Sequence, residues 1–391
     1  MTPVDEAVRR AIERHGPIPF EKVMERALYD PVAGFYRTGG RAGRRGDFIT
    51  SPEVGGLFGA VVARALDRWW EDAGRPAVFA VIDAGAGPGT LARTVLASTP
   101  ACAEALRYVL VESSPEQRAL HAERLALEPS TAAFASIPDP DEDARTAGAV
   151  PPGPVVVSMA ELPRVDGPCV VLANELLDNL PCGVAERTAD GWAEVHVGRA
   201  PGGDLPASAP AAPAQSDSLV EVLLPLDRTW ADRLERLAPA APVGARVPVA
   251  RHANRWIGEA LAAAGPGGRV VAFDYGRPTR DLAAVGQDGW LRTYRDHDRG
   301  GPPLERLGTQ DITADVPIDQ LLPAPDFDVA QAEWLAAHGL DELVEEGRRT
   351  WHERAHLGDL EALRARSRIG EAEALTDPAG LGAFRVLEWQ R

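Results

Sequence analysis

The stretch VFAVIDAGAGPGTL, residues 78–91, decides how this chain is expected to fold. Its first part, residues 78–83, is an apolar run that ends in an aspartate, which is typical of a buried strand in a parallel sheet. Gly85, Gly87 and Gly89 then follow at alternate positions, just before a helical segment. Glycines let the backbone turn tightly and approach a ligand closely, and a helix N-terminus offers free N–H groups. The stretch therefore predicts a strand, a ligand-binding turn and a helix.

Short apolar runs alternate with helical segments through most of the remaining chain. Because these runs are apolar on both faces, they indicate a mainly parallel sheet that is covered by helices. The closing segment, residues 384–390, instead alternates apolar and polar residues and is expected to add an antiparallel strand. The predicted fold class is α/β with a doubly wound core. The further predicted strands of the core are residues 106–112, 155–158, 169–174 and 269–275.

Three regions outside the core strands are expected to have structure of their own. Residues 1–30 have apolar positions at helical spacing and predict an N-terminal helical lobe. One helix, with a hydroxyl cap and a proline in its first turn, is expected over residues 50–70. The segment 184–197 predicts a β-hairpin around Asp190-Gly191, which would be inserted into the core.

The expected domain organisation has four parts. Residues 1–75 are the helical lobe with an active-site loop, and residues 76–182 are the ligand-binding core. Residues 183–265 are the inserted hairpin region, which contains a Pro- and Ala-rich loop at 198–218 that is expected to be mobile. Residues 266–391 complete the core sheet and add helices on the substrate side.

Composition excludes several classes of protein. The 391 residues include 41 basic and 58 acidic ones, for a net charge of −17, which disfavours nucleic acid as a partner because basic residues supply most of that affinity. The lone lysine, Lys22, is not followed by Ser or Thr, so there is no P-loop. No apolar run approaches the ~18 residues of a membrane span, and the charged N-terminus lacks a signal-peptide core. With three widely spaced cysteines, a cytoplasmic protein is expected.

The glycine turn is expected to bind a nucleoside with a cationic amino-acid moiety. Its spacing is GxGxG, and Thr90 stands where the dinucleotide fingerprint has its third glycine. The acidic Asp83 precedes the first glycine by two positions, and Glu112 follows Gly89 by 23 residues at the end of the next strand. A carboxylate at Glu112 can accept both ribose hydroxyls. These features favour S-adenosylmethionine, and the alternative is a structural turn with a solvated Glu112.

A second motif, ANELLDNLP at residues 173–181, also follows a buried strand. Ligands bind at the carboxyl ends of strands in open α/β sheets. Glu175 and Asp178 are three positions apart and would share a face if a helix follows. Two carboxylates there could orient a guanidinium, whose planar donors match carboxylate oxygens. The equal alternative is that the two residues cap the following helix.

Two further clusters could line the substrate side. The segment GDFITSPEV, residues 46–54, places Asp47, Phe48, Thr50 and Ser51 at a helix start after a glycine-rich loop. Taken alone, it is more simply a helix cap. A second cluster combines residues from a strand and a loop, namely Asp274, Tyr275, Arg292 and His297.

The sequence HERAH, residues 352–356, matches the HExxH pattern of zinc peptidases. That spacing would put two imidazoles on one helix face, with Glu353 as the base and Glu371 or Glu373 as a third ligand. The neighbouring residues are strongly polar, whereas such a helix is usually buried, and the HxxGxxH extension is missing. We therefore do not expect a metal site.

Nine blocks of the sequence together resemble the MidA family of class I S-adenosylmethionine-dependent methyltransferases. They occur in the family's order and span nearly the whole chain. This family includes the mitochondrial methyltransferase that acts as an assembly factor for complex I. The blocks are ALYDPVAGFY, GDFITSPEV, the strand with GAGPGTL, YVLVESSPEQ, ANELLDNLP, VVAFDYG, LRTYRDH, QDITADV and DPAGLGAFRVLEW.

The resemblance implies a Rossmann-like sheet of seven mostly parallel strands and the cofactor S-adenosyl-L-methionine, with S-adenosyl-L-homocysteine as the product. It implies three catalytic or substrate-edge residues, namely Asn174, Glu175 and Asp178. The residues implied for the cofactor are Thr50, Ser51, Asp83, Gly85, Gly87, Gly89, Thr90, Glu112, Ser113 and Met159, and those implied for the substrate are Asp47, Phe48, Asp274, Tyr275, Arg292 and His297.

By analogy with the mitochondrial member, the expected reaction is methylation of a protein arginine. Glu175 is expected to orient the guanidinium and to favour its loss of a proton, with Asp178 in support. One alternative is a small-molecule O- or N-methyltransferase with the same fold. Another is an assembly factor that binds the cofactor without turnover. The state of assembly, including a homodimer, is left open.

Overall fold

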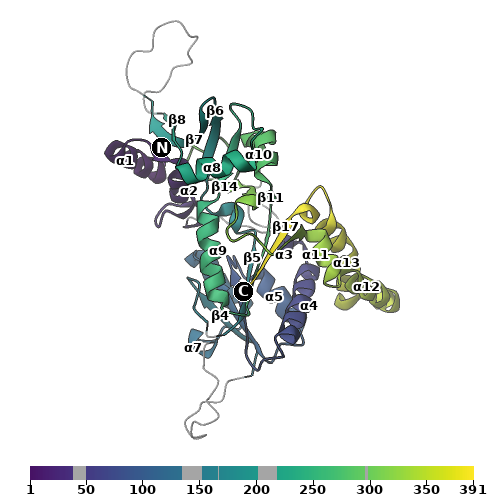
Figure 1. Cartoon of the computed structure of the whole chain (residues 1–391). Helices are drawn as coiled ribbons and strands as arrows, with labels where there is room; N and C mark the ends of the chain where they lie inside the picture. The colour runs from purple at the N-terminus through teal and green to yellow at the C-terminus, as the bar shows by residue number, and fades with distance from the viewer. Residues whose placement is uncertain (38–49, 134–151, 166, 201–217, 296–297) are drawn as a thin grey trace. The chain divides into compact units, whose positions relative to one another are not determined.

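The computed structural model describes the chain except for residues 38–49, 134–151, 166, 201–217 and 296–297 (Figure 1). Asp47, Phe48 and His297, which the sequence assigns to the substrate side, lie outside the described residues, as does nearly all of the 198–218 loop. The chain divides into two compact units. The first comprises residues 1–40, 178–255 and 276–321, and the second comprises residues 41–177, 256–275 and 322–391.

The second unit is built on a seven-stranded sheet. Four successive neighbour pairs, from β10 to β4, are parallel, whereas β17 runs antiparallel to both of its neighbours. The sheet is therefore mixed, and the antiparallel closing strand that its alternating sequence predicts is confirmed. In spatial order the strands are β16 (Phe327–Ala330), β17 (Arg385–Gln390), β10 (Arg269–Asp274), β5 (Cys169–Asn174), β2 (Phe79–Ala84), β3 (Leu106–Val111) and β4 (Val155–Met159).

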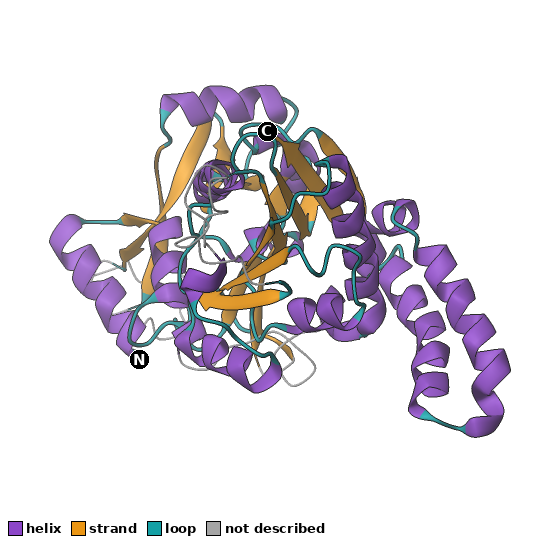
Figure 2. Ribbon diagram, turned by 90° about the horizontal axis from the view of Figure 1, so that it is seen from below, coloured by secondary structure: helices purple, strands orange, loops and turns teal. Residues whose placement is uncertain are grey.

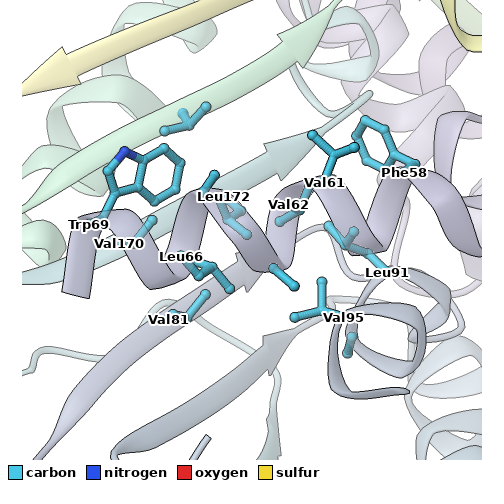
Figure 3. Close-up of a cluster of buried hydrophobic side chains, with 14 of the residues drawn as sticks. Phe58, Val61, Val62, Leu66, Trp69, Val81, Leu91, Val95, Val170 and Leu172 are labelled. Carbon is cyan, nitrogen blue, oxygen red and sulfur yellow. The ribbon is translucent and has the colours of Figure 1, made fainter. Parts of the chain in front are cut away.

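The central strands of this sheet are mainly apolar and are buried on both faces, whereas the edge strand β16 is partly exposed. On one face, α4 (Gly56–Asp72) packs Phe58, Val62 and Leu66 against the strands (Figure 3). Side chains of adjacent strand positions point to opposite faces, and Ile82, next to the core residue Val81, is also fully buried. The core strands predicted from the sequence are confirmed, with boundaries that differ by one residue or none.

The remaining helices of the second unit follow the order of the chain. They are α3 (Ser51–Val54), α5 (Thr90–Ala97), α6 (Pro115–Arg124), α7 (Ser130–Ala133), α11 (Gln331–Ala337), α12 (Leu340–Arg354) and α13 (Leu360–Thr376). The helix α9 (Arg251–Ala264) begins in residues of the first unit and ends in residues of the second. In Figures 1 and 2, α12 and α13 lie side by side as a helical hairpin.

The single helix predicted over residues 50–70 is wrong, because the structure has two helices, α3 and α4, that are separated at Gly55. The carboxylate of Glu371 from α13 lies at this junction and accepts a hydrogen bond from the Leu57 N–H at 2.8 Å. A Cβ atom on Gly55 would lie 2.1 Å from the Glu371 Cδ. The break therefore depends on a tertiary contact with a residue more than 300 positions away in the sequence.

The first unit is a mainly antiparallel β structure with helices, and only the small pair of strands at residues 276–277 and 316–317 is parallel among the strand pairs described there. Its main sheet has the order β1-β7-β6-β9, with β8 also paired to β7. The hairpin predicted around Asp190-Gly191 is confirmed as β6 and β7, which meet at Thr188 and Gly191. The strands of this sheet are β1 (Ile18–Pro19), β6 (Gly183–Thr188), β7 (Gly191–Arg199), β8 (Leu219–Pro225) and β9 (Arg246–Val249).

Helices and two small sheets complete the first unit. Residues 1–30, which the sequence predicts to be helical, contain α1 (Pro3–His15) and α2 (Phe20–Tyr29), and the other helices are α8 (Arg228–Leu237) and α10 (Thr279–Val285). The small sheets pair β11 (Gly276–Arg277) with β15 (Val316–Pro317), and β12 (Leu291–Arg295) with β13 (Asp298–Arg299) and β14 (Asp311–Ala314). The four-part division expected from the sequence differs, because the N-terminal helices group with the inserted hairpin.

Two global features bear on the expected classes of protein. The three cysteines are buried and free, so no disulfide links them. Within the described ranges, none of the helices combines the length and the apolar character that crossing a bilayer requires.

Candidate functional site

The second unit has a topological switch point between β2 and β5. From β2 the chain continues to β3 and β4 on one side, and it then returns to add β5 on the other side of β2. Ligands of open α/β sheets bind outside the carboxyl ends of the strands at such a point. Ala84 of β2 is in register with Ala173 of β5. The glycine turn and the Asn174-Glu175 motif therefore leave adjacent strands at the same edge, as their sequence positions predict.

The glycine turn requires its glycines for conformation. Gly85, Gly87 and Gly89 have φ values of 70°, 52° and 78°, in the left-handed region that L-residues with side chains avoid. A Cβ atom on Gly85 would lie 3.0 Å from Leu176 Cδ1, and one on Gly89 would lie 3.1 Å from Leu110 Cδ2. Gly87 differs, because among the described residues, apart from its chain neighbours, no atom lies within 4 Å of such a Cβ atom. The space beside Gly87 is where a ligand can approach the backbone.

Glu112 borders this turn from the end of β3. Its Oε2 accepts a hydrogen bond from the Gly87 N–H at 3.0 Å, and its Oε1 accepts one from the Ser114 N–H at 2.7 Å. Burial raises the pKa of the Glu112 carboxyl, and these two backbone donors oppose that shift. The structure thus places the carboxylate directly beside the glycine turn, where the sequence predicts it.

Asp83 is the last polar residue of β2 and is only 2% exposed. Its Oδ2 accepts a hydrogen bond from the Tyr108 hydroxyl at 3.1 Å. Burial raises the pKa of Asp83 to about 7, the Tyr108 hydrogen bond opposes this shift, and the charge of Glu112 adds to it. Asp83 therefore lies beneath the turn rather than in its opening.

The other residues that the sequence assigns to the cofactor lie around the same turn. Thr90 begins α5 and donates its hydroxyl to Glu53 Oε1 at 2.6 Å. The carbonyl of Met159 accepts the Glu112 N–H at 3.0 Å. Ser113 is exposed next to Glu112. Thr50 is buried and precedes α3, but it does not form the predicted hydroxyl cap.

His121 is a functional candidate that the sequence analysis misses. It is fully buried on α6, and its Nε2 lies 2.7 Å from the Gly87 carbonyl oxygen, while its Nδ1 lies 2.8 Å from the Ser158 hydroxyl. Burial lowers the pKa of His121, and so do the charges of Arg118 and Arg124. The motif PEQRALHAER offers no local signal of this role, because Gly87 lies 34 residues away.

Glu175 follows β5 with an unusual backbone. Its φ of 50° is uncommon for a residue with a side chain and marks a constrained turn. Its Oε1 accepts hydrogen bonds from the Ser51 N–H and from Asn174 Nδ2, both at 3.1 Å. Ser51 is in turn fixed by its hydroxyl, which donates to Gln331 Oε1 at 3.1 Å. The orientation of the Glu175 carboxylate is therefore set by two neighbouring donors.

Asp274 supports the Glu175 turn from the end of β10. This residue is 1% exposed, and its Oδ2 accepts the N–H groups of Leu176 at 3.1 Å and Leu177 at 2.7 Å. Its Oδ1 accepts the Tyr275 N–H at 2.9 Å. The sequence assigns Asp274 and Tyr275 to substrate binding, but the structure uses the Asp274 carboxylate to hold backbone, and the Tyr275 ring lies 4.0 Å from that of Phe384.

The helix on which Glu175 and Asp178 would share a face does not form. Only a short 3₁₀ turn, Leu177–Asn179, follows β5, and Glu175 precedes it in a left-handed conformation. Asp178 belongs to the first unit and is 2% exposed. Burial raises its pKa to about 7, and the charge of Arg292 opposes that shift.

Arg292 of the first unit, which the sequence assigns to the substrate side, forms an ion pair with Asp315. Arg277 also pairs with Asp315, with a distance of 3.0 Å between Nε and Oδ2. Arg292 and Asp178 thus belong to an internal cluster of charges in that unit.

The HERAH segment does not have the helical geometry of a zinc peptidase. The α-helix α12 ends at Arg354 in the middle of the motif, and residues 355–357 form a 3₁₀ turn. His352 and His356 are both exposed, and Glu371 is engaged with the start of α4. Among the residues that the structure describes, no group of three or more His, Cys, Asp or Glu side chains could hold a metal ion.

Comparison with known proteins identifies a family model that matches most of the chain. Residues 61–327 match the family model described as "Putative S-adenosyl-L-methionine-dependent methyltransferase". A crystal structure from Burkholderia thailandensis of a candidate methyl transferase, bound to S-adenosyl-homocysteine, is 26% identical with a TM-score of 0.75. The similarity covers 99% of this chain and 92% of that one. The α/β methyltransferase fold is thereby shown.

Several relatives are named as protein arginine methyltransferase NDUFAF7, mitochondrial. The Xenopus tropicalis protein is 28% identical over 78% of this chain and 66% of its own length. The Mus musculus protein is 28% identical over 82% and 69%, and a Drosophila melanogaster homologue is 33% identical over 49% and 43%. The chain thus spans between 43% and 69% of the length of these three relatives. Because these relatives are mitochondrial, the expected cytoplasmic location is contradicted and is withdrawn.

Proposed function

Because the chain belongs to the S-adenosyl-L-methionine-dependent methyltransferase family whose model covers residues 61–327, we propose that it methylates a nitrogen of a protein arginine side chain. The family assignment confirms the resemblance to the MidA family, and it makes S-adenosyl-L-methionine the cofactor. The arginine substrate is the activity named for the relatives, and it comes to this chain as part of the proposal. We further assign the mixed sheet to the class I, Rossmann-like type.

The glycine turn and Glu112 fit such a cofactor. The space beside Gly87 admits a ligand against the backbone, because no atom of the residues that the structure describes, chain neighbours aside, lies within 4 Å of the position that a Cβ atom would take. Glu112 is fixed by two backbone donors, yet a carboxylate has about four acceptor positions, so it can also accept ribose hydroxyls. In this proposal Gly85, Gly87, Gly89 and Glu112 hold the nucleoside.

Asp83 has a different role from the one expected. Its burial and its hydrogen bond with Tyr108 favour a role in shaping the floor of the turn. Burial raises the pKa of Asp83 to about 7, so its carboxyl is only partly ionised at neutral pH. Its attraction for a cationic ligand is weakened accordingly.

Glu175 is the residue that we assign to the acceptor. S-adenosyl-L-methionine supplies a methyl group that a sulfonium sulfur has already activated. An arginine acceptor carries a positive charge at neutral pH and must lose a proton when its nitrogen gains a substituent. A carboxylate whose Oε1 is held by Ser51 and Asn174 can orient the planar guanidinium and take that proton. Asn174 is assigned to this orienting role.

The single observation that supports the proposal most is the arrangement at the switch point. The nucleoside turn leaves β2, and the constrained Glu175 turn leaves the adjacent strand β5. The methyl donor and the methyl acceptor could therefore meet at one edge of the sheet. Alignment of these two reactants lowers the activation barrier of the transfer.

Replacement of Glu175 by Gln tests the assignment. The amide keeps the size of the side chain but cannot take a proton, so we expect turnover to fall by about 10²- to 10⁴-fold while the affinity for S-adenosyl-L-methionine stays within a factor of about three. Transfer of a radiolabelled methyl group to lysate proteins, followed by size separation, measures turnover and separates protein from small-molecule acceptors. Glu373→Gln, at an exposed position of α13, is the matched control.

The outcomes separate the alternatives. Unchanged turnover in Glu175→Gln removes Glu175 from this role. Label that appears only in small molecules favours a metabolite methyltransferase, and cofactor binding without any labelled acceptor favours an assembly factor. Calorimetry that detects neither S-adenosyl-L-methionine nor S-adenosyl-L-homocysteine binding refutes the whole proposal.

A further inference from the structure

We propose that His121 is a positioning residue for the cofactor, and that its Nε2–H fixes the Gly87 carbonyl and so keeps the glycine turn in the conformation that binds the nucleoside. This inference rests on the proposed function. It adds to it a residue that neither the glycine motif nor the family resemblance identifies.

The first step of the argument is that the Gly87 peptide needs external support. Gly87 lacks a Cβ atom and has a φ of 52°, and a glycine populates several backbone conformations about equally well. Among the described residues, no atom would touch a Cβ atom on Gly87, so side-chain packing does not hold this position. Its conformation is therefore set by its hydrogen bonds.

The second step is that one segment of chain supplies both of these bonds. On the amide side, the Gly87 N–H donates to Glu112 Oε2 at 3.0 Å, and on the carbonyl side the Gly87 oxygen lies 2.7 Å from His121 Nε2. Glu112 ends β3, and His121 lies on α6, which begins only three residues later at Pro115. The segment 112–121 thus holds the peptide at Gly87 from both ends.

The third step concerns which nitrogen carries the hydrogen. A carbonyl oxygen only accepts hydrogen bonds, so Nε2 must donate to Gly87. In the neutral ring Nδ1 is then an acceptor, and the Ser158 hydroxyl, 2.8 Å away on β4, donates to it. The lowered pKa of His121, which burial causes, agrees with a neutral ring in this tautomer. The ring is therefore fixed by two different elements, β4 and the glycine turn.

A structural role alone would have a different consequence. A buried, hydrogen-bonded histidine can simply stabilise the core, and its loss would then lower the melting temperature without a specific effect on the ligand. His338 is a comparable, half-buried residue that directly follows α11, and its Nδ1 lies 2.8 Å from the carbonyl oxygen of Trp334 in that helix. His338 belongs to the same unit and also has a lowered pKa through burial, so His338→Gln is the matched control.

The experiment is calorimetric titration of the full chain with S-adenosyl-L-methionine and with S-adenosyl-L-homocysteine. Leucine in place of His121 leaves the Gly87 carbonyl without its donor, so we expect the dissociation constants for both ligands to rise about 5- to 100-fold. Glutamine can donate an N–H from nearly the same place, so His121→Gln should restore most of the affinity. Ser158→Ala should give a smaller loss, and His338→Gln should give none.

A spectroscopic readout is independent of affinity. In the ¹⁵N-labelled protein, we expect His121 to be the neutral tautomer with hydrogen on Nε2 at pH 7, and its ring signals should shift when either ligand is added. Hydrogen on Nδ1 would overturn the inference. If His121→Leu does not fold, the glutamine and serine variants and this measurement still test it.

The experiment distinguishes failure of this inference from failure of the proposed function. If the native protein binds both ligands and folded His121→Leu binds them equally well, this inference is wrong and the proposed function stands. If His338→Gln weakens binding as much as His121→Leu, the effect is general destabilisation and the inference is also wrong. If the native protein binds neither ligand, the proposed function fails and this inference fails with it.

Discussion

Replacement of Asp274 by Asn should destabilise the protein, because the Asp274 carboxylate holds the backbone of the turn that follows Glu175. The carboxylate accepts three backbone N–H groups, from Leu176 at 3.1 Å, Leu177 at 2.7 Å and Tyr275 at 2.9 Å, and its residue is 1% exposed. An asparagine whose oxygen faces Leu176 and Leu177 must turn its NH₂ group toward the Tyr275 N–H. One charged hydrogen bond is then lost, at about 1.5–3 kcal/mol, and a buried donor is left unpaired, at about 1–3 kcal/mol.

The expected loss in the free energy of unfolding is therefore about 3–5 kcal/mol. Denaturant titration followed by tryptophan fluorescence and by circular dichroism measures it. Asp72→Asn, at an exposed position in the same unit, should stay within about 0.5 kcal/mol of the native protein. A loss below about 1 kcal/mol for Asp274→Asn, with the fold unchanged, would show that the three bonds do not support the turn as we argue.

A functional consequence follows from the same contact. Because these bonds hold the backbone next to Glu175, whose φ is 50°, the Asn variant should also lose methyl transfer under conditions in which it is still folded. Cofactor affinity should change less, since the Glu112 carboxylate is held by the N–H groups of Gly87 and Ser114. Equal turnover by the folded variant would contradict the positioning role.

Three further predictions concern the cofactor end of the site. In Glu112→Gln, an NH₂ group replaces one of the two oxygens that accept the Gly87 and Ser114 N–H groups, so calorimetry should show affinity for S-adenosyl-L-methionine reduced by about 10- to 100-fold; an unchanged affinity would exclude the carboxylate from binding. Gly85→Ala should destabilise more than Gly87→Ala, because both have positive φ but only the Gly85 Cβ would press on a neighbour, at 3.0 Å; equal losses in thermal unfolding would contradict this. Asp83 has its pKa raised from 3.8 to about 7, so the folded state binds the proton more tightly and its contribution to stability falls as pH rises from about 4 to 7. Asp83→Asn should remove that part of the decline, and superimposable pH profiles of unfolding free energy for variant and native protein would refute it.

Much of the fold follows from local sequence patterns. Runs such as residues 106–112 and 169–174 are mainly apolar on both faces, as a strand that is buried on both faces requires, and the structure has β3 and β5 there. The alternation in residues 384–390 correctly predicts an antiparallel strand. The edge strand β16 was missed, because Phe327–Ala330 is short and partly exposed and so carries little pattern.

The candidate site was predicted in part. The glycine turn and Glu112 could be paired because adjacent parallel strands end at one edge, but only the structure shows the hydrogen bond from the Gly87 N–H to Glu112. The spacing of Glu175 and Asp178 could not show whether a helix follows β5. The backbone at Glu175 is left-handed, and the turn after it is held by Asp274, a residue 98 positions from Leu176. Two residues that are three positions apart share a face only where the backbone between them is helical.

The sequence by itself determined which segments are strands, where the glycine turn lies and which family the chain resembles, because these depend on periodicity and on residue types at short range. Only the tertiary structure decided which side chains support the site: His121 on Gly87, Asp274 beneath Glu175, and Glu371 at the start of α4. Each is a polar group that finds a backbone partner far along the chain. The need to satisfy buried polar groups is general, but the partner that satisfies them exists only once the strands and helices have packed.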